Sequence, residues 1–318
     1  MRILVMGAGA VGGYFGGRLA QCGGVEEVAF LVRPGRKAQL DRDGLVIESS
    51  SAGDYRGKVN AILKDEVRPG WDVVLLACKA YDLDEAIQAV RPAVDLHTAV
   101  LPLLNGLSHL ETIQTAFGPN RVLGGLAGVQ ATMGPEGEVR HLAPLTFTKF
   151  GELDGHMSNR VAALKAAFDR TPIRAEASAD IRGAMWEKLV FLGTLAAATV
   201  LMRANLGEIV AAPGGSSWLD RLLDRNAATA AAEGHPVPAK ALEGFRSFFR
   251  TNPAATASMM RDLESGGRIE ADHILGYLLD AVRRAGVPDD LHEAAYIQAK
   301  AYEARRDARR LPGQLGRL

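Results

Sequence analysis

The first twelve residues constrain the fold more than any other part of the chain. An apolar run, Arg2–Met6, leads directly into a glycine motif, after which a helical pattern begins. The motif consists of Gly7, Ala8, Gly9, Ala10, Val11 and Gly12. In such a strand, turn and helix, the first glycine permits the turn, the second lets the backbone approach a pyrophosphate, and the third allows close helix–strand packing. The motif predicts dinucleotide binding at the helix start; the alternative is a glycine-rich turn in another α/β protein.

Composition excludes several classes of function. The chain has 318 residues, enough for about two domains, and 47% of them are hydrophobic. Its 37 basic residues balance its 37 acidic ones, so no global charge favours nucleic acid or acidic membranes as partners. Two cysteines are too few for a disulfide framework, and the seven histidines show no metal-ligand spacing. We expect no metal site and a reducing compartment.

The start of the chain and its longest apolar run both favour a cytoplasmic protein. No signal peptide precedes the first strand. Residues 189–202 form the longest apolar run, which is shorter than the roughly 20 residues that a membrane span requires. We therefore expect this run to be a helix buried within protein.

Alternating strand and helix patterns fill the first half of the chain. Apolar runs at 28–32, 72–77 and 98–102 predict buried strands of a parallel sheet with helices on both faces. The segments 44–48 and 59–63 could pair as a hairpin. Glycine-punctuated extended segments follow between residues 121 and 150, and we expect them to add antiparallel strands to the same sheet.

Strand patterns end before residue 181, and helical periodicity continues from there to about residue 306. Proline and glycine clusters near residues 213, 236, 252, 266 and 286 interrupt it. The sequence thus predicts an α/β fold: a Rossmann-type domain at 1–177 with a parallel sheet, followed by an all-helical domain at 178–318. The apolar helical half allows a homodimer.

Residues after the predicted strands indicate which dinucleotide binds. A NAD site usually has Asp or Glu at the end of the second strand, where this chain has Arg33. A guanidinium can bind a 2′-phosphate, so NADPH is favoured; alternatively, Arg33 only caps the sheet edge. Lys79 and Asn105 follow later strands and should face the same crevice.

Two charged residues lie on predicted apolar helix faces. Lys188 is at the centre of a stripe with Met185 and Leu192, so it should be paired, desolvated or lining a cavity; alternatively, its stem extends to the surface. Glu270 shares a face with Ile274, or is simply a carboxylate at a helix N-terminus.

These residues supply what a carbonyl reductase needs besides a hydride donor. Lys188 can donate a proton to the developing alkoxide, Ser258 can bind a substrate carboxylate, and Glu270 a substrate hydroxyl. We expect the active site in a cleft between the two domains.

The chain resembles the ketopantoate reductase family along nearly its whole length. The resemblance is carried by the motifs at Gly7–Gly12, Arg33, Cys78–Ala80, Asn105–Gly106, Ile181–Leu189, Ser258–Asp262 and Ile269–Asp272. It implies a Rossmann-type domain followed by a helical domain, and NADPH-dependent reduction of 2-dehydropantoate to pantoate. It further implies Lys188 as general acid, Glu270 and Ser258 as substrate-binding residues, and Lys79 and Asn105 at the nicotinamide end.

The chain departs from the family pattern on the helix that carries Lys188. Asparagines are common four and eight residues after the lysine, where this chain has Leu192 and Ala196. Thr194, Thr199 or Asn205 could compensate as substrate-binding residues. Two alternatives therefore stay open: a related reductase of a less polar 2-oxo or 3-oxo acid, and a non-catalytic NADPH-binding sensor.

Overall fold

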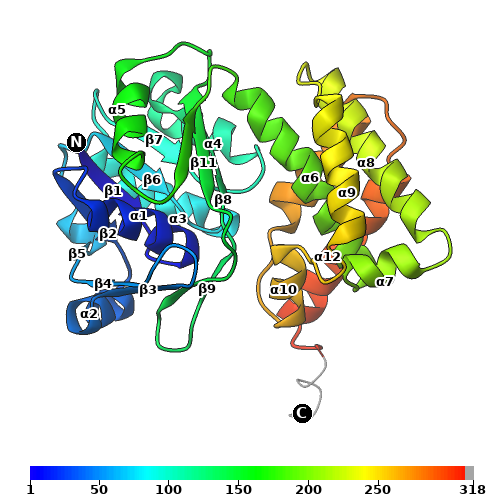
Figure 1. Ribbon diagram of the computed structural model, residues 1–318, viewed down its shortest axis with the longest axis horizontal. Helices are drawn as coiled ribbons and strands as arrows, with labels where there is room; N and C mark the ends of the chain where they lie inside the picture. The colour runs from blue at the N-terminus through cyan, green and yellow to red at the C-terminus, as the bar shows by residue number, and fades with distance from the viewer. Residues whose placement is uncertain (312–318) are drawn as a thin grey trace. The chain divides into compact units, whose positions relative to one another are not determined.

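The computed structural model describes residues 1–311 and divides them into two compact units (Figure 1). The first comprises residues 1–105 and 109–184. The second comprises residues 106–108 and, among the described residues, 185–311, so the boundary falls inside one long helix.

A five-stranded parallel sheet is the centre of the first unit. Its strand order is β5 (Asn60–Ile62), β2 (Glu27–Leu31), β1 (Arg2–Met6), β6 (Val73–Leu76) and β7 (Ala99–Pro102). The register aligns Leu4 with both Ala29 and Val74, and all three side chains are fully buried. The helices of this unit are α1 (Ala10–Cys22), α2 (Pro34–Asp43), α3 (Leu83–Val90), α4 (His109–Phe117) and α5 (Asn159–Phe168). The predicted Rossmann-type parallel sheet is confirmed.

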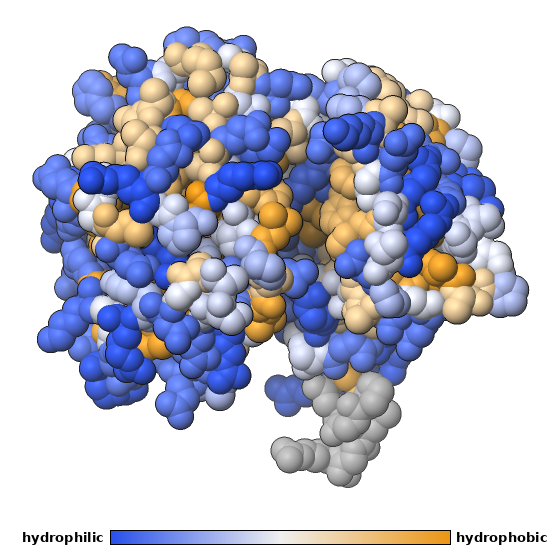
Figure 2. All heavy atoms as spheres, viewed as in Figure 1, coloured by the Kyte–Doolittle hydropathy of each residue, from blue (hydrophilic) through white to orange (hydrophobic). Residues whose placement is uncertain are grey.

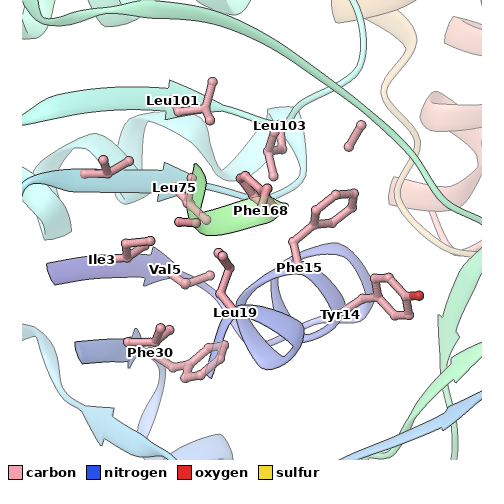
Figure 3. Close-up of a cluster of buried hydrophobic side chains, with 14 of the residues drawn as sticks. Ile3, Val5, Tyr14, Phe15, Leu19, Phe30, Leu75, Leu101, Leu103 and Phe168 are labelled. Carbon is pink, nitrogen blue, oxygen red and sulfur yellow. The ribbon is translucent and has the colours of Figure 1, made fainter. Parts of the chain in front are cut away.

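Helix α1 packs tightly on this sheet. Figure 3 shows Leu19 of α1 beside Val5 of β1, and both side chains are fully or nearly fully buried, as are Phe15 of α1 and Phe30 of β2. A Cβ at Gly16 would lie 2.7 Å from the Phe30 ring, so only glycine allows this helix–sheet distance. Burial on this scale fixes where α1 begins relative to the end of β1.

Two smaller sheets correct the expected strand pairing. The 44–48 segment, seen as β3 (Leu45–Ser49), pairs with β4 (Tyr55–Gly57), whereas β5 joins β2 in parallel, so the predicted hairpin is wrong. The antiparallel strands after residue 121 do form, in two further sheets, and a parallel bridge between Val100 of β7 and Val122 links one of these sheets to the edge of the central sheet. One sheet has the order β4, β3, β10 (Val139–His141) and β9 (Ala131–Met133), and the other has β12 (Arg174–Ala177), β11 (Phe147–Glu152) and β8 (Leu123–Gly128).

The second unit is entirely helical among its described residues. Its helices are α6 (Ile181–Met202), α7 (Leu206–Ala211), α8 (Gly215–Ala232), α9 (Ala239–Thr251), α10 (Ser258–Glu264), α11 (Tyr277–Arg284) and α12 (Asp290–Asp307). Helix α6 is long and apolar enough to cross a membrane by length and composition, but 67% of its most apolar stretch is buried inside the structure. It is the core helix of this unit, as the apolar run predicts.

Most interruptions of the helical region match the proline and glycine clusters, but two do not. The chain turns between α6 and α7 at Arg203, which has a positive φ of 52° and no glycine or proline nearby to signal the break. Residues Asp272–Gly276 form a π-helical turn directly before α11. Such turns are rare overall, but those that occur are often at functional sites.

Polar residues dominate the visible surface of the molecule. Figure 2 shows hydrophilic residues over most of the face drawn, with smaller apolar patches between them. Ion pairs such as Arg250–Asp220, at 2.6 Å, join α9 to α8. Exposed pairs of this kind contribute about 0–1 kcal/mol each, so the apolar core provides most of the stability.

Candidate functional site

The glycine motif has the geometry that a dinucleotide requires. Gly7 has a φ of 93°, which favours glycine, and it turns the chain out of β1. A Cβ at Gly12 would lie 2.1 Å from the carbonyl oxygen of Gly7, so a side chain there cannot fit. A Cβ at Gly9 would meet no atom within 4 Å, which leaves the approach to its backbone open.

The start of α1 has no side chain that competes with a phosphate. Gly9 is the N-cap, no side chain caps the helix, and its first turn has no acidic residue. The unpaired N–H groups and the positive end of the helix dipole therefore favour an anion. The motif fits the pyrophosphate of a nicotinamide dinucleotide.

The other predicted cofactor residues follow strands that end at the same edge of the parallel sheet. Arg33 comes two residues after β2, Lys79 three residues after β6, and Asn105 three residues after β7. Lys79 and Asn105 are both partly buried. Ligands bind outside the carboxyl ends of the strands in open α/β sheets, so these positions suit cofactor contacts. Those contacts stay predictions.

Arg33 is exposed and already has acidic neighbours. Its side chain is 70% exposed, and its Nη2 lies 2.8 Å from Oε2 of Glu85 and 3.9 Å from Oδ2 of Asp82. A 2′-phosphate would compete with these carboxylates for the guanidinium. Because the pair is exposed, it contributes little and is easily exchanged.

In the helical unit, Lys188 lies among apolar neighbours on α6. Met185 and Leu195 on the predicted stripe are buried, while Lys188 and Leu192 keep partial exposure. Burial lowers the pKa of Lys188 from 10.5 to about 8, and the negative charge of Glu270 partly opposes that shift. A lysine with this pKa can both hold and release a proton near neutral pH.

This pKa predicts how reduction depends on pH. A general acid must be protonated, so kcat/KM for carbonyl reduction should be constant well below pH 8 and fall about tenfold per pH unit well above it. The reverse oxidation needs the neutral amine and should rise with pH until it levels above pH 8. Steady-state rates in both directions between pH 6 and about 10 test this; parallel profiles in the two directions would contradict it.

Glu270 immediately precedes the helical segment that begins at Ala271, and its side chain is only 5% exposed. Both interpretations of the sequence therefore hold in part: the residue is at a helix N-terminus and is also buried. The π-helical turn that follows changes the helical register, so a 3.6-residue period does not describe this face. The structure brings Glu270 near enough to Lys188 for their charges to interact.

Ser258 and Asn205 differ in how their side chains are used. Ser258 is the first residue of α10, and its hydroxyl makes no hydrogen bond within residues 1–311. The Asn205 side chain caps α7 by accepting a hydrogen bond from the N–H of Glu208, at 2.9 Å. Asn205 also lines a surface depression of about 550 Å³ whose lining includes neither Lys188 nor Glu270. A substrate contact for either residue stays a prediction.

The two threonines of α6 are buried, and their hydroxyls make hydrogen bonds inside the protein. The Thr194 hydroxyl donates to the carbonyl of Val190 and accepts from Asn226, while the Thr199 hydroxyl donates to the carbonyl of Leu195. Both side chains are fully buried. Neither can replace the amides that are absent at Leu192 and Ala196. The accessible strip of α6 beyond Lys188, where Leu192 keeps partial exposure, is therefore apolar.

Two features near the predicted site residues have no local signal in the sequence. Residues 106–108 belong to the helical unit, where the Ser108 hydroxyl lies 3.2 Å from Nδ1 of His273 in the π-helical turn. In the first unit, Arg36 binds the carbonyl of Ala8 inside the glycine motif. Both contacts join segments far apart in the sequence, so only the structure reveals them.

The chain matches the models of one known protein family along most of its length. The model of the family "Ketopantoate reductase PanE/ApbA" matches residues 3–155, and the model of its C-terminal part matches residues 180–303. The chain is 35% identical to "Uncharacterized oxidoreductase YkpB" of Bacillus subtilis (strain 168), over 96% of this chain and 99% of that protein.

Solved structures show the same fold. A 2-dehydropantoate 2-reductase from Methylococcus capsulatus is 29% identical, with a TM-score of 0.86 over 96% of this chain and 98% of that one. D-mandelate dehydrogenase with NADH and anilino(oxo)acetate shares the fold, with a TM-score of 0.84 over 96% of this chain and 99% of that one, at 22% identity. The chain is therefore an oxidoreductase that belongs to the ketopantoate reductase family.

Proposed function

We propose that this chain is an NADPH-dependent reductase of 2-oxo acids, with dinucleotide binding in residues 1–177 and substrate binding in residues 178–318. The observation that carries the proposal is the buried Glu270 close enough to Lys188 for their charges to interact, in a chain that also has an open dinucleotide turn; burial lowers the pKa of this lysine to about 8. We further propose that the protein acts in the cytoplasm, and that the apolar helical half allows a homodimer.

Three side chains of the helical unit have different roles in the proposed reduction. Bound NADPH supplies a hydride to the carbonyl carbon of the substrate. Lys188 gives a proton from Nζ to the carbonyl oxygen, which completes the alcohol and leaves a neutral amine. Glu270 holds the ammonium and a polar group of the substrate, and the Ser258 hydroxyl binds the substrate carboxylate. We place Lys79 and Asn105 at the nicotinamide end.

NADPH rather than NADH is proposed from the residues that follow β2. Neither Asp nor Glu stands where a carboxylate would accept from the ribose 2′-hydroxyl, and Arg33 has an exposed guanidinium there. A planar guanidinium can form two charge-assisted hydrogen bonds with a 2′-phosphate. We expect the phosphate to displace Glu85 from this arginine.

We propose the less polar of two candidate substrates, and one observation supports this choice. 2-Dehydropantoate, for which the family's reductases are named, carries a hydroxyl beyond its oxo group. The accessible strip of α6 beyond Lys188 presents Leu192, and the buried threonine hydroxyls are already hydrogen-bonded. A substrate hydroxyl against this strip would lose its hydrogen bonds to water without replacement. The structure thus favours a 2-oxo acid with an apolar side chain.

A matched pair of substrates tests this preference. 3,3-Dimethyl-2-oxobutanoate differs from 2-dehydropantoate only in lacking the hydroxyl. We expect a higher kcat/KM for the deoxy compound, by roughly 10- to 100-fold, because apolar pockets reject an added hydroxyl by about this factor. Leu192→Asn should reduce or reverse the ratio, and the apolar control Leu192→Met should leave it nearly unchanged. A wild-type preference for 2-dehydropantoate would instead support the family's substrate.

A non-catalytic NADPH sensor is the alternative from another class. Such a protein would keep the glycine turn but would have no need of a low-pKa lysine beside a buried carboxylate. A screen of 2-oxo acids with NADPH distinguishes the two. Binding of NADPH without turnover of any oxo acid would overturn the proposed reductase.

A further inference from the structure

Arg36 is tied to the glycine motif by its guanidinium. This residue lies in the first turn of α2, and its side chain is partly buried. Nε and Nη2 both donate to the carbonyl oxygen of Ala8, at 3.1 and 2.8 Å, and Nη1 donates to the carbonyl oxygen of Gly137, at 2.7 Å. The arginine thus links α2, the glycine motif and the turn between β9 and β10.

No carboxylate neutralises this guanidinium within residues 1–311. All its hydrogen-bond acceptors are neutral: two backbone carbonyls and the side-chain oxygen of Gln39. Burial alone lowers the pKa of Arg36, without an acidic neighbour to raise it. Arg33, by contrast, is exposed and paired with Glu85. Removing a cation even partly from water without an acidic partner costs free energy, which favours a role for its charge.

The peptide that joins Ala8 to Gly9 connects this cation to the cofactor site. A trans peptide points its C=O and its N–H in opposite directions, and the described chain has no cis peptide. Two donors from Arg36 fix the Ala8 carbonyl, and they thereby fix the direction of the Gly9 N–H. That N–H makes no hydrogen bond within the described chain, and Gly9 is exposed. A cation at the carbonyl also polarises the peptide and strengthens its N–H as a donor.

We propose that Arg36 is a positioning residue for the dinucleotide pyrophosphate, acting through the Ala8–Gly9 peptide. NADPH and NADH share the pyrophosphate, so Arg36 serves both cofactors equally. Selection between them depends instead on residues that face the 2′ position, such as Arg33. The inference rests on the proposed dinucleotide binding: if the wild-type protein binds neither cofactor, the proposed function fails first.

Direct binding of each cofactor tests the inference. Dissociation constants for NADPH and NADH are measured by titrating nicotinamide fluorescence on the wild type, Arg36→Met, Arg36→Lys and Arg33→Asp. Arg36→Met should weaken both cofactors about tenfold or more, since hydrogen bonds to charged groups are lost, and should keep their ratio within about twofold. Arg36→Lys should fall between, because one ammonium cannot hold the carbonyl with two N–H groups. Arg33→Asp should weaken NADPH selectively.

Gln39 provides a matched control for a purely structural role. Its side chain donates to the carbonyl of Glu136 in the same β9–β10 turn and accepts from Nη1 of Arg36, but it does not contact Ala8, which Nε and Nη2 of Arg36 hold. Gln39→Ala should therefore leave both dissociation constants within about twofold of wild type. Equal weakening by Gln39→Ala and Arg36→Met would overturn the inference, as would unchanged binding in Arg36→Met or loss of NADPH alone. If Arg36→Met does not fold, Arg36→Lys decides by the same criteria.

Discussion

Replacing Lys188 by alanine is expected to lower kcat for 2-oxo acid reduction by about 10²- to 10⁴-fold, the usual contribution of a positioned general acid. The alkoxide that forms on hydride transfer would lose both its proton donor and the positive charge of the Lys188 ammonium. The glycine turn lies in the other unit and is untouched, so the dissociation constant for NADPH should change by less than about threefold. Stopped-flow measurement of NADPH oxidation and fluorescence titration supply the two quantities.

Lys188→Arg separates proton donation from charge. Arginine keeps the positive charge beside Glu270 but does not give up its proton near neutral pH. We expect this variant to recover little of the activity lost in Lys188→Ala. Full activity in Lys188→Arg would mean that charge alone is needed, and undiminished turnover in Lys188→Ala would exclude Lys188 as the acid.

The second large effect is expected at the glycine motif, where two substitutions form a matched pair. Gly9→Ala adds a methyl group that meets no protein atom within 4 Å but occupies the approach to the pyrophosphate. It should raise the dissociation constant for NADPH on the order of 100-fold while the stability of the cofactor-free protein changes by less than about 0.5 kcal/mol.

Gly12→Ala should affect both quantities. Its Cβ would lie 2.1 Å from the carbonyl oxygen of Gly7 and 3.1 Å from the Cβ of Ala77, so α1 must move away from the sheet. We expect a loss of about 1–3 kcal/mol in the free energy of unfolding, together with weak cofactor binding. Urea unfolding of the cofactor-free variants measures the difference; equal stability of the two variants would contradict the packing argument.

Local patterns predicted the elements of this fold better than their partners. The strand, turn and helix at the N-terminus depend on residues adjacent in sequence, and the structure confirms them. The segment that forms β5 was recognisable as a strand, but periodicity does not say which strand it pairs with, and it joins β2 instead of β3. The separate sheets around β10 and β11 also depend on pairings between strands that are distant in sequence.

The candidate site likewise combines features that follow from local sequence with features that depend on long-range contacts. Helical spacing placed Lys188 on an apolar stripe, because that argument needs only the period of one helix. The influence of Glu270 on its pKa comes from another part of the chain and required the structure. Arg36 meets Ala8 and Gly137 across 28 and 101 residues of sequence, and no spacing rule relates them. The π-helical turn after Glu270 could not be predicted from a period of 3.6 residues per turn.

The pH dependence of hydride transfer in a single turnover tests the central claim most directly. Wild type and Lys188→Ala are compared with saturating NADPH and the best oxo acid from the substrate screen, and loss of nicotinamide fluorescence gives the rate. We predict that the wild-type rate falls as the pH rises through about 8, whereas the much slower rate of the variant shows no transition there. The same transition in both proteins would show that a group other than Lys188 supplies the proton.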